Sequence, residues 1–282
     1  MKKTLSTLCA VMMCMFINAQ TIHWLTFIDT TDPNVGQTDV FGHQMLYSYF
    51  INEVNAALGG KGYKSDIHDY YGTAVSPENC KDAIEMLTIT NPDDIIVFYY
   101  IGNGDRPITD SVYMKEHPYP QMCMAQWDSN KYIPLEWVDE QLSSKGARLS
   151  VTIGMCSNGN GVGPIMPGAV TPIEKSKGLI RLTPNRIKRI QELFLNTKGH
   201  VIAASASPGQ HSSCMQIKGA NQFVDRYTYA ICSFFQTQLE NYNEELTWDK
   251  FLNKISWFVD KNSESCQTPI HNCYPKDEKV GD

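Results

Sequence analysis

The run Asp94-Ile95-Ile96-Val97-Phe98-Tyr99-Tyr100-Ile101 is the strongest strand signal in the chain. Its apolar residues follow one another without alternating with polar ones, so both faces of the strand are expected to be buried. A strand buried on both faces is typical of the centre of a parallel sheet that helices cover on each side. We therefore expect the segments on either side of this run to alternate between strand and helix.

The rest of the chain shows that alternation. Further strands are expected at residues 22–29, 63–68, 148–155, 200–206 and 267–272. Helices are expected at residues 41–58, 76–89, 134–144, 183–196, 221–239 and 247–261. This succession of βαβ units predicts an α/β fold around a mostly parallel sheet of about six strands.

The composition is that of an ordinary globular protein, and it excludes disordered and collagen-like chains. The chain has 282 residues, of which 42% are hydrophobic, and no repeat or low-complexity linker divides it. Residues 20–282 are therefore expected to form one domain. The net charge of −6 at pH 7 argues against nucleic acid as a partner.

The first 19 residues have the pattern of a secretory signal peptide. Lys2 and Lys3 precede an apolar run from Leu5 to Ile17, and Ala19 is the small residue at the expected cleavage point. This run is shorter than the roughly 20 residues that a membrane-spanning helix needs, and no later stretch is apolar enough to serve as an anchor. The mature chain is therefore expected to be exported, to the periplasm or outside the cell. Removal of Lys2 and Lys3 takes the net charge from −6 to −8.

In sheets of this kind, ligands bind at the carboxyl ends of the strands. Three loops that follow apolar strands are therefore selected, at residues 102–106, 156–163 and 205–214. Together they contain the polar residues Asn103, Asp105, Cys156, Asn158, Ser207, Gln210 and His211. A functional site is expected where these loops meet.

The same loops carry a resemblance to the caspase and metacaspase-like cysteine peptidases. Residues 95–104 resemble the family's apolar strand that ends in Tyr-Ser-Gly-His-Gly and presents the catalytic histidine. Residues 151–159, Val-Thr-Ile-Gly-Met-Cys-Ser-Asn-Gly, resemble the strand that ends in Asp-Ala-Cys-His-Ser-Gly with the nucleophile. Residues 201–210 are similar to the next strand and turn of bacterial members, and Gln267-Thr268-Pro269 fits a short motif near their C-terminal strand.

This resemblance covers about residues 22–273 and implies a caspase-like three-layer αβα sandwich that binds a peptide or protein. Cys156 would be the nucleophile, and the backbone N–H groups of Gly104 and Cys156 would stabilise the oxyanion. The substrate cleft would be lined by Gly154, Asp105, Ser207 and Gln210. Residues 104–133 are too long for an ordinary loop and would form a lid or an insertion near this cleft.

Two positions depart from the family pattern. Asn103 stands where the family has its catalytic histidine, and Gly154 stands where metacaspases have an aspartate that helps bind a basic P1 residue. An amide cannot exchange a proton near neutral pH, whereas a positioned acid–base group contributes about 10²–10⁴-fold to the rate. We therefore expect a catalytically impaired homologue that binds a peptide or protein as a pseudo-enzyme.

Two alternatives remain open. His211 follows the fifth strand, close to the loop of Cys156, and could replace the missing base in a working cysteine endopeptidase. In a structural exported module, by contrast, the cleft would have no function.

The cysteines and histidines do not have metal-ligand spacing, because Cys-x-x-Cys and His-x-x-x-His are both absent. Residues 159–163 lack the spacing of a nucleotide-binding loop, so no cofactor is expected. Seven of the nine cysteines remain after removal of the signal peptide, an odd number that leaves at least one thiol unpaired. Cys266 and Cys273 are close enough in sequence to form a disulfide.

Overall fold

A computed structural model describes residues 19–33, 35–106, 111–124, 131–159, 165–170, 182–264 and 266–275. All of the expected signal peptide except Ala19 lies outside the described residues. The same holds for parts of two loops considered above, at residues 107–110, 125–130 and 160–163.

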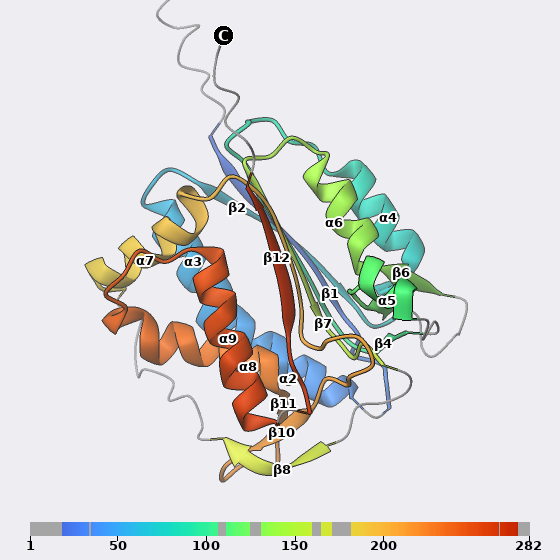
Figure 1. Ribbon diagram of the computed structural model, residues 1–282. Helices are drawn as coiled ribbons and strands as arrows, with labels where there is room; N and C mark the ends of the chain where they lie inside the picture. Colours follow the sequence, from blue (N-terminus) through green and yellow to red (C-terminus); the bar gives the residue numbers. More distant parts are fainter. Residues whose placement is uncertain are drawn as a thin grey trace, which may run out of the picture.

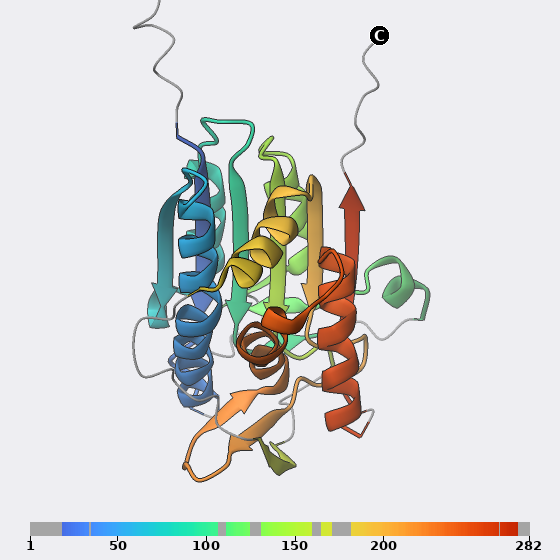
Figure 2. The ribbon, with the colours of Figure 1, turned by 90° about the vertical axis from the view of Figure 1, so that its left-hand side faces the viewer.

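The central sheet has six strands and confirms the expected α/β fold (Figure 1). In spatial order they are β2 (Lys64–Tyr71), β1 (Thr21–Ile28), β3 (Ile95–Ile101), β7 (Leu149–Met155), β9 (Gly199–Ala204) and β12 (Ile270–Pro275). All neighbouring pairs are parallel except β9 and β12, and Figure 2 shows β12 running against the others. Every residue of β3 is buried, as the unbroken apolar run predicts.

Helices cover both faces of this sheet and complete the three layers (Figure 1). One face packs against α2 (Gly36–Leu46), α3 (Asn52–Gly59), α7 (Pro184–Leu195), α8 (Arg226–Ser233) and α9 (Trp248–Asn262). The other face packs against α4 (Pro77–Met86) and α6 (Leu135–Ser143). The side chains of Ser76 and Thr183 accept hydrogen bonds from backbone N–H groups in the first turns of α4 and α7, and each of these two residues is followed by a proline. Both features favour the start of a helix at these positions.

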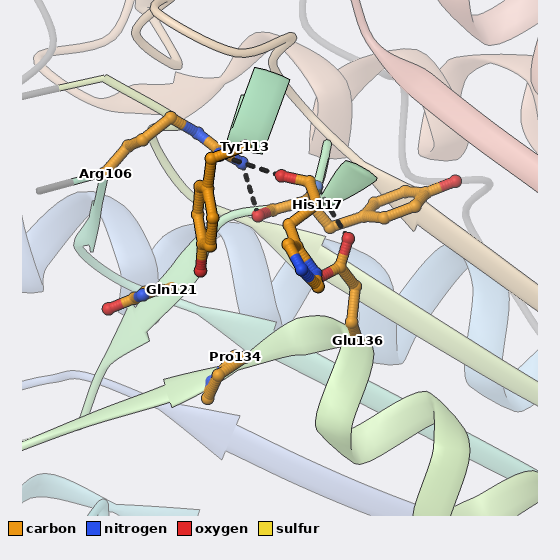
Figure 3. A pocket seen from close by; sticks show the side chains of 7 residues that line it. Arg106, Tyr113, His117, Gln121, Pro134 and Glu136 are labelled. Atoms are coloured by element: carbon orange, nitrogen blue, oxygen red, sulfur yellow. Dashed lines mark hydrogen bonds and ion pairs between the residues drawn. The ribbon is translucent and has the colours of Figure 1, made fainter. Parts of the chain in front are cut away.

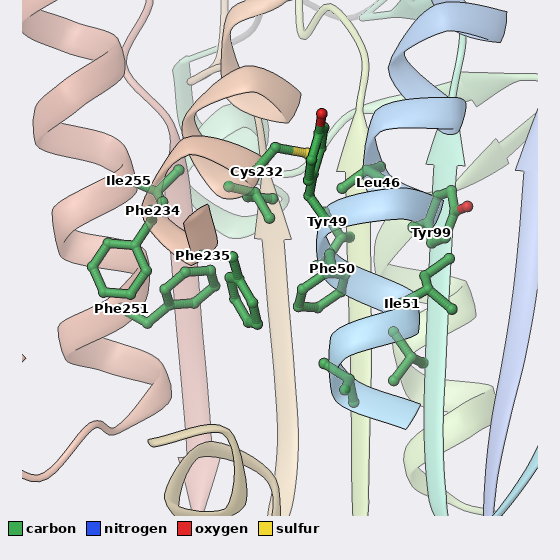
Figure 4. Packing of buried hydrophobic residues seen from close by; sticks show 14 of the residues in the cluster. Leu46, Tyr49, Phe50, Ile51, Tyr99, Cys232, Phe234, Phe235, Phe251 and Ile255 are labelled. Carbon is green, nitrogen blue, oxygen red and sulfur yellow. The ribbon is translucent and has the colours of Figure 1, made fainter. Parts of the chain in front are cut away.

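Two π-helical turns meet in the larger core. The segments η1 (Tyr47–Ile51) and η3 (Phe234–Gln238) continue α2 and α8, and η3 is followed by the 3₁₀ turn η4 (Leu239–Asn241). Phe50 of η1 meets Phe235 of η3 edge to face, with ring centroids 4.8 Å apart (Figure 4). Such aromatic contacts add to the stabilisation that burial of the rings gives.

Two small sheets and a few short elements lie outside this core. One sheet joins β11 (Phe223–Asp225), β10 (Cys214–Ile217) and β8 (Ile165–Val170), and the other joins β4 (Gly104–Asp105), β5 (Gln121–Cys123) and β6 (Tyr132–Pro134). The short helices are η2 (Gly72–Ala74) and α5 (Ser111–Glu116). In its described part, the segment 104–133 is thus an insertion with elements of its own, as expected.

One helix prediction is wrong at its start. Residues 221–225 belong to the turn and second strand of the β10–β11 hairpin, and α8 begins only at Arg226. The reason is the side chain of Asp225, which accepts the Thr228 N–H at 2.9 Å and caps the helix there. No helix within the described ranges is long and apolar enough to cross a membrane.

Candidate active site

The described parts of the three predicted loops, after β3, β7 and β9, meet at the carboxyl edge of the sheet, and the loop after β1 joins them there. Backbone hydrogen bonds join them: Asp29 N–H donates to Ile101 O at 2.9 Å, and Ser205 N–H donates to Gly154 O at 2.9 Å. Cys156 directly follows β7, and Asn103 and Gly104 follow the neighbouring strand β3. The positions that the resemblance selects are therefore adjacent in space.

Cys156 is buried against the backbone of Gly104. Its exposed fraction is 1%, and a Cβ placed on Gly104 would lie only 2.8 Å from Cys156 Sγ. Burial raises the pKa of the Cys156 thiol, and the carboxyls of Asp225 and Asp39 raise it further. The thiol is therefore protonated at neutral pH, and an enzyme that uses it as a nucleophile needs a base nearby.

Asn103 is held away from such a role. Its side-chain Nδ2 donates to Asp32 Oδ2 at 2.7 Å, and its backbone carbonyl oxygen accepts a hydrogen bond from the Tyr100 hydroxyl at 2.8 Å. No hydrogen bond joins Asn103 to the Cys156 thiol in the described part of the chain. The amide thus pairs with a carboxylate and has no group that exchanges a proton.

His211 lies in a loop that runs beside the loop of Cys156. Asn158 N–H donates to Gln210 O at 2.9 Å, and Ser212 N–H donates to Ser157 Oγ at 3.1 Å. Nevertheless, the described residues include no hydrogen bond between His211 and Cys156. The Nδ1 atom of His211 is buried and has no hydrogen-bond partner.

Asn158 and Arg106 hold the loop of Cys156 in place, a link that the sequence alone did not suggest. Asn158 Oδ1 accepts the Arg106 Nε–H at 2.7 Å, and Asn158 Nδ2 donates to Pro118 O at 2.7 Å and Ala206 O at 3.0 Å. The other guanidinium nitrogens of Arg106 donate to two backbone carbonyls of the insertion, those of His117 and Tyr119. A small polar pocket forms next to them (Figure 3).

The carboxylate of Asp105 accepts hydrogen bonds from a backbone N–H of the turn and from a tyrosine, rather than from the guanidinium of Arg106. Its Oδ1 accepts the backbone N–H of Arg106 at 2.7 Å, and its Oδ2 accepts the hydroxyl of Tyr132 at 3.2 Å. The charge of Arg106 is instead close to Glu136, which also pairs with His117 at 3.2 Å on the rim of the pocket in Figure 3.

The other expected cleft residues make internal contacts. The Cα of Gly154 faces α6, because a Cβ there would lie 2.8 Å from Leu135 Cδ2. Ser207 Oγ donates to Thr268 O at 2.7 Å, and Gln210 Oε1 accepts the Thr268 N–H at 2.7 Å. Ser207 and Gln210 thus attach their loop to the segment before β12.

Gln267 is a further residue of the site, and its role was not anticipated although its motif was noted. It is fully buried, and its Oε1 accepts both the N–H (3.0 Å) and the hydroxyl (2.6 Å) of Ser213. Its Nε2 donates to Ser205 O at 2.9 Å. The same Nε2 also donates to Ser212 Oγ at 3.3 Å, so one amide bonds to four polar groups of the loop after β9.

Four buried carboxyl groups surround the same edge: Asp29, Asp32, Asp39 and Asp225. Burial, followed by repulsion from the other three carboxyls, raises the pKa of Asp39 well above its usual range. Asp39 Oδ2 is buried without a hydrogen-bond partner. We call these four residues the acidic cluster. Its only signal in the sequence is the pair of aspartates at the end of the first strand and in the loop after it.

Cys266 and Cys273 both carry free thiols, so the disulfide considered from their spacing does not form. Cys266 is exposed in a loop, whereas Cys273 lies on β12 and packs against the larger core. The described residues hold no group of three or more His, Cys, Asp or Glu side chains arranged to bind a metal ion.

Comparison with known proteins gives a likeness of overall fold. No family model matches the sequence. No curated protein matches it either. Among solved structures, caspase-1 from Spodoptera frugiperda is similar, with 11% identity and a TM-score of 0.46 over 90% of this chain and 85% of that one. This likeness concerns the path of the chain and bears on none of the site residues.

Proposed function

We propose that this chain is a caspase-like peptidase homologue with impaired catalysis, which binds a peptide or protein at the carboxyl edge of the sheet. One observation carries the proposal. The position expected to hold the base is occupied by Asn103, whose amide is bonded to Asp32, beside a buried and protonated Cys156.

Peptide hydrolysis by a cysteine peptidase depends on proton transfer, which the amide of Asn103 cannot perform. A cysteine peptidase needs one group to accept the thiol proton and to return it to the leaving amine. Each unit by which the pKa of a thiol exceeds the pH lowers the thiolate fraction about tenfold. Backbone N–H donors at Gly104 and Cys156 would still stabilise an oxyanion, but they cannot generate the nucleophile.

The charge of the site supports a cationic ligand. Two carboxyls of the acidic cluster, those of Asp39 and Asp225, lie close enough to act on Cys156, and one oxygen of Asp39 has no partner. Arg226 is close to Asp225, but it donates its hydrogen bonds to Ser213 Oγ and Asn262 O. An arginine or lysine side chain of a bound peptide would supply a donor for Asp39 Oδ2. The carboxyls of Asp29, Asp32 and Asp225 already accept hydrogen bonds from the chain itself.

Cys266 is an exposed free thiol on the same chain, so it serves as an internal reference for the reactivity of Cys156 in a test of catalytic impairment. The mature protein is treated with iodoacetamide, and alkylation of each cysteine is followed by mass spectrometry. We expect Cys156 to react at least tenfold more slowly than Cys266, and a broad peptide library to remain uncut. Faster alkylation of Cys156, or cleavage that is lost in Cys156→Ala, would refute the proposal.

A second candidate is an active endopeptidase in which His211 acts as the base for Cys156. It is favoured by the buried Nδ1 of His211, which has no partner and could accept a proton after a small loop movement. In that case His211→Ala would abolish cleavage and slow alkylation of Cys156. Equal alkylation of Cys156 in the wild type and in His211→Ala would exclude this role.

Export remains part of the proposal and rests on residues 1–19 alone. Expression with the full N-terminus, followed by sequencing of the mature N-terminus, tests it. A chain that keeps Met1 in the cytoplasm of an exporting host would contradict it.

A further inference from the structure

Asp32 accepts a hydrogen bond from the side chain that stands where the resemblance places a catalytic histidine. Asn103 Nδ2 donates to Asp32 Oδ2 at 2.7 Å. Because an ionised carboxylate only accepts hydrogen bonds, the amide presents its nitrogen to Asp32 and its oxygen elsewhere. The orientation of the Asn103 side chain is therefore set by Asp32.

The carboxylate of Asp32 is itself held in place by the loop between β1 and α2. Asp32 is buried, with 4% of its surface exposed, and its Oδ1 accepts the Val35 N–H at 3.0 Å. Its backbone N–H donates to Asp29 Oδ1 at 3.2 Å, and its carbonyl oxygen accepts the Gly36 N–H at 3.0 Å. The loop is tight, because a Cβ on Gly36 would lie 2.7 Å from Thr30 O. The carboxylate therefore has a fixed position.

The backbone of residue 103 is fixed as well. The carbonyl oxygen of Asn103 accepts two hydrogen bonds, from the Tyr100 hydroxyl at 2.8 Å and from the Cys123 N–H at 2.9 Å. The next residue is Gly104, where a Cβ would lie 2.8 Å from Cys156 Sγ. Residue 103 thus directly precedes the residue whose backbone lies against the thiol.

An asparagine at this position reproduces half of a histidine side chain. The Nδ2 atom of asparagine and the Nδ1 atom of histidine are both bonded to Cγ, so they lie the same number of bonds from the backbone. An imidazole at position 103 with the same side-chain torsions would therefore donate its Nδ1–H to Asp32 Oδ2. Its Nε2, which has no counterpart in asparagine, would then keep a lone pair that accepts a proton.

We propose that Asp32 is a positioning residue for the side chain at position 103. The site holds the carboxylate that orients the ring of a histidine base, and it lacks the proton-accepting half of that ring. A carboxylate in this place selects the imidazole tautomer that can take a proton from a nucleophile, and it stabilises the imidazolium that forms. This inference rests on the proposed function, because it treats Cys156 and position 103 as a catalytic pair that has lost its base.

The tautomer of a histidine at position 103 tests the role of Asp32 directly. Asn103→His is prepared with ¹⁵N-labelled histidine, and its additional ring signals are identified by comparison with the wild-type chain. The ¹⁵N chemical shifts show which ring nitrogen carries the proton in the neutral imidazole. We expect the proton on Nδ1, and we expect Asp32→Asn to move it to Nε2, because an amide can donate to Nδ1.

Alkylation of Cys156 by iodoacetamide measures the chemical consequence. In Asn103→His the thiol proton moves to Nε2, the sulfur bonds to the methylene carbon of the reagent, and iodide leaves. Adding Asp32→Asn to this chain should slow the alkylation, since the wrong tautomer cannot accept the thiol proton. In the wild-type background no base is present to be misoriented. The slowing caused by Asp32→Asn should therefore be about tenfold or more greater in the Asn103→His background than in the wild-type background.

A matched control removes a carboxylate elsewhere on the same chain. Asp82 is exposed on α4, outside the loops that form the site. Asp82→Asn should leave the alkylation rate of the Asn103→His chain unchanged. Circular dichroism and urea unfolding verify that each chain is folded, and if the double variant does not fold, the tautomer in Asn103→His alone decides the question.

The outcomes separate this inference from the proposed function. A proton on Nε2 in Asn103→His, or an equal effect of Asp32→Asn in both backgrounds, would overturn the role of Asp32. An Asn103→His chain that does not fold, or whose Cys156 reacts no faster than in the wild type, would also overturn it, because position 103 would then not hold a base toward the thiol. The proposed function fails on a different observation, namely wild-type Cys156 that reacts faster than Cys266.

Discussion

Gly104 lies so close to Cys156 that replacing it with alanine should lower the free energy of unfolding. A methyl group at residue 104 would overlap the carbonyl oxygen of Ser157 and would lie 2.8 Å from Cys156 Sγ and 2.9 Å from Cys156 Cβ. The oxygen belongs to the backbone of the loop that Asn158 and Arg106 hold in place, so it cannot move aside alone. Gly104→Ala should therefore disturb the whole loop.

The expected cost lies at the upper end of the range for overpacked positions. Overpacking usually costs about 1–3 kcal/mol and occasionally more. Because the overlap in Gly104→Ala is with backbone rather than with a mobile side chain, we expect a loss of about 3 kcal/mol or more. For a domain of this size that corresponds to a fall of about 6–12 °C in Tm.

Two other glycines calibrate the measurement. A Cβ on Gly154 meets the end of the Leu135 side chain at 2.8 Å, so Gly154→Ala should cost only about 1 kcal/mol. A Cβ on Gly59, the last residue of α3, meets nothing within 4 Å, and Gly59→Ala should stabilise the protein by about 0.5 kcal/mol.

Urea unfolding followed by tryptophan fluorescence and by circular dichroism measures all three variants. The reasoning requires the order Gly59→Ala, Gly154→Ala, Gly104→Ala from most to least stable. If Gly104→Ala unfolds at the wild-type urea midpoint while Gly59→Ala behaves as expected, the backbone of residue 104 does not touch Cys156. The assignment of Gly104 N–H to an oxyanion site would then be lost.

Three further predictions concern the same edge of the sheet. Because the pKa of Asp39 is raised by folding, its contribution to stability is present below the pKa of the unfolded chain, about 3.9, and is lost as pH rises through the folded value. Asp39→Asn should therefore remove part of the fall in unfolding free energy with rising pH; identical slopes in urea titrations at several pH values would contradict this. Asn103→His should raise the rate of Cys156 alkylation about tenfold or more, since an imidazole there can accept the thiol proton, and an unchanged rate means that the thiol lies out of reach. Asn158→Ala removes three hydrogen bonds, one of them to the charged Arg106, and should cost about 3 kcal/mol in urea unfolding, whereas a loss below about 1 kcal/mol would mean that the loop does not depend on them.

The central sheet could be predicted from the sequence because its strands are local apolar runs. The run Ile95–Ile101 needs no information from elsewhere in the chain to indicate burial on both faces, and the structure places it as β3 inside the sheet. The β10–β11 hairpin was missed for the opposite reason. Its strands are only four and three residues long, and over so short a span apolar residues fit a helix and a strand equally well.

The position of the candidate site could be predicted from the sequence, but the charged groups around it could not. The rule that ligands bind at strand ends brought Cys156 and Asn103 together, and it needs only the order of the strands. The acidic cluster depends on contacts between distant segments, because Asp39 lies on α2 and Asp225 caps α8. Periodicity along the chain carries no information about such a meeting. The hydrogen bond from Asn103 to Asp32 is of the same kind.

The direction of β12 has a practical consequence for handling the protein. Strand β1 begins at the amino edge of the sheet, and β12, running the other way, ends at that same edge beside the start of β9. The start of β1 and the end of β12 therefore both lie at the edge of the sheet opposite the acidic cluster and the hairpin (Figures 1 and 2). A protein immobilised on a sensor chip through either of these ends would present the carboxyl edge of the sheet, where binding is proposed, to the solution. Attachment through a lysine of the hairpin would block that edge.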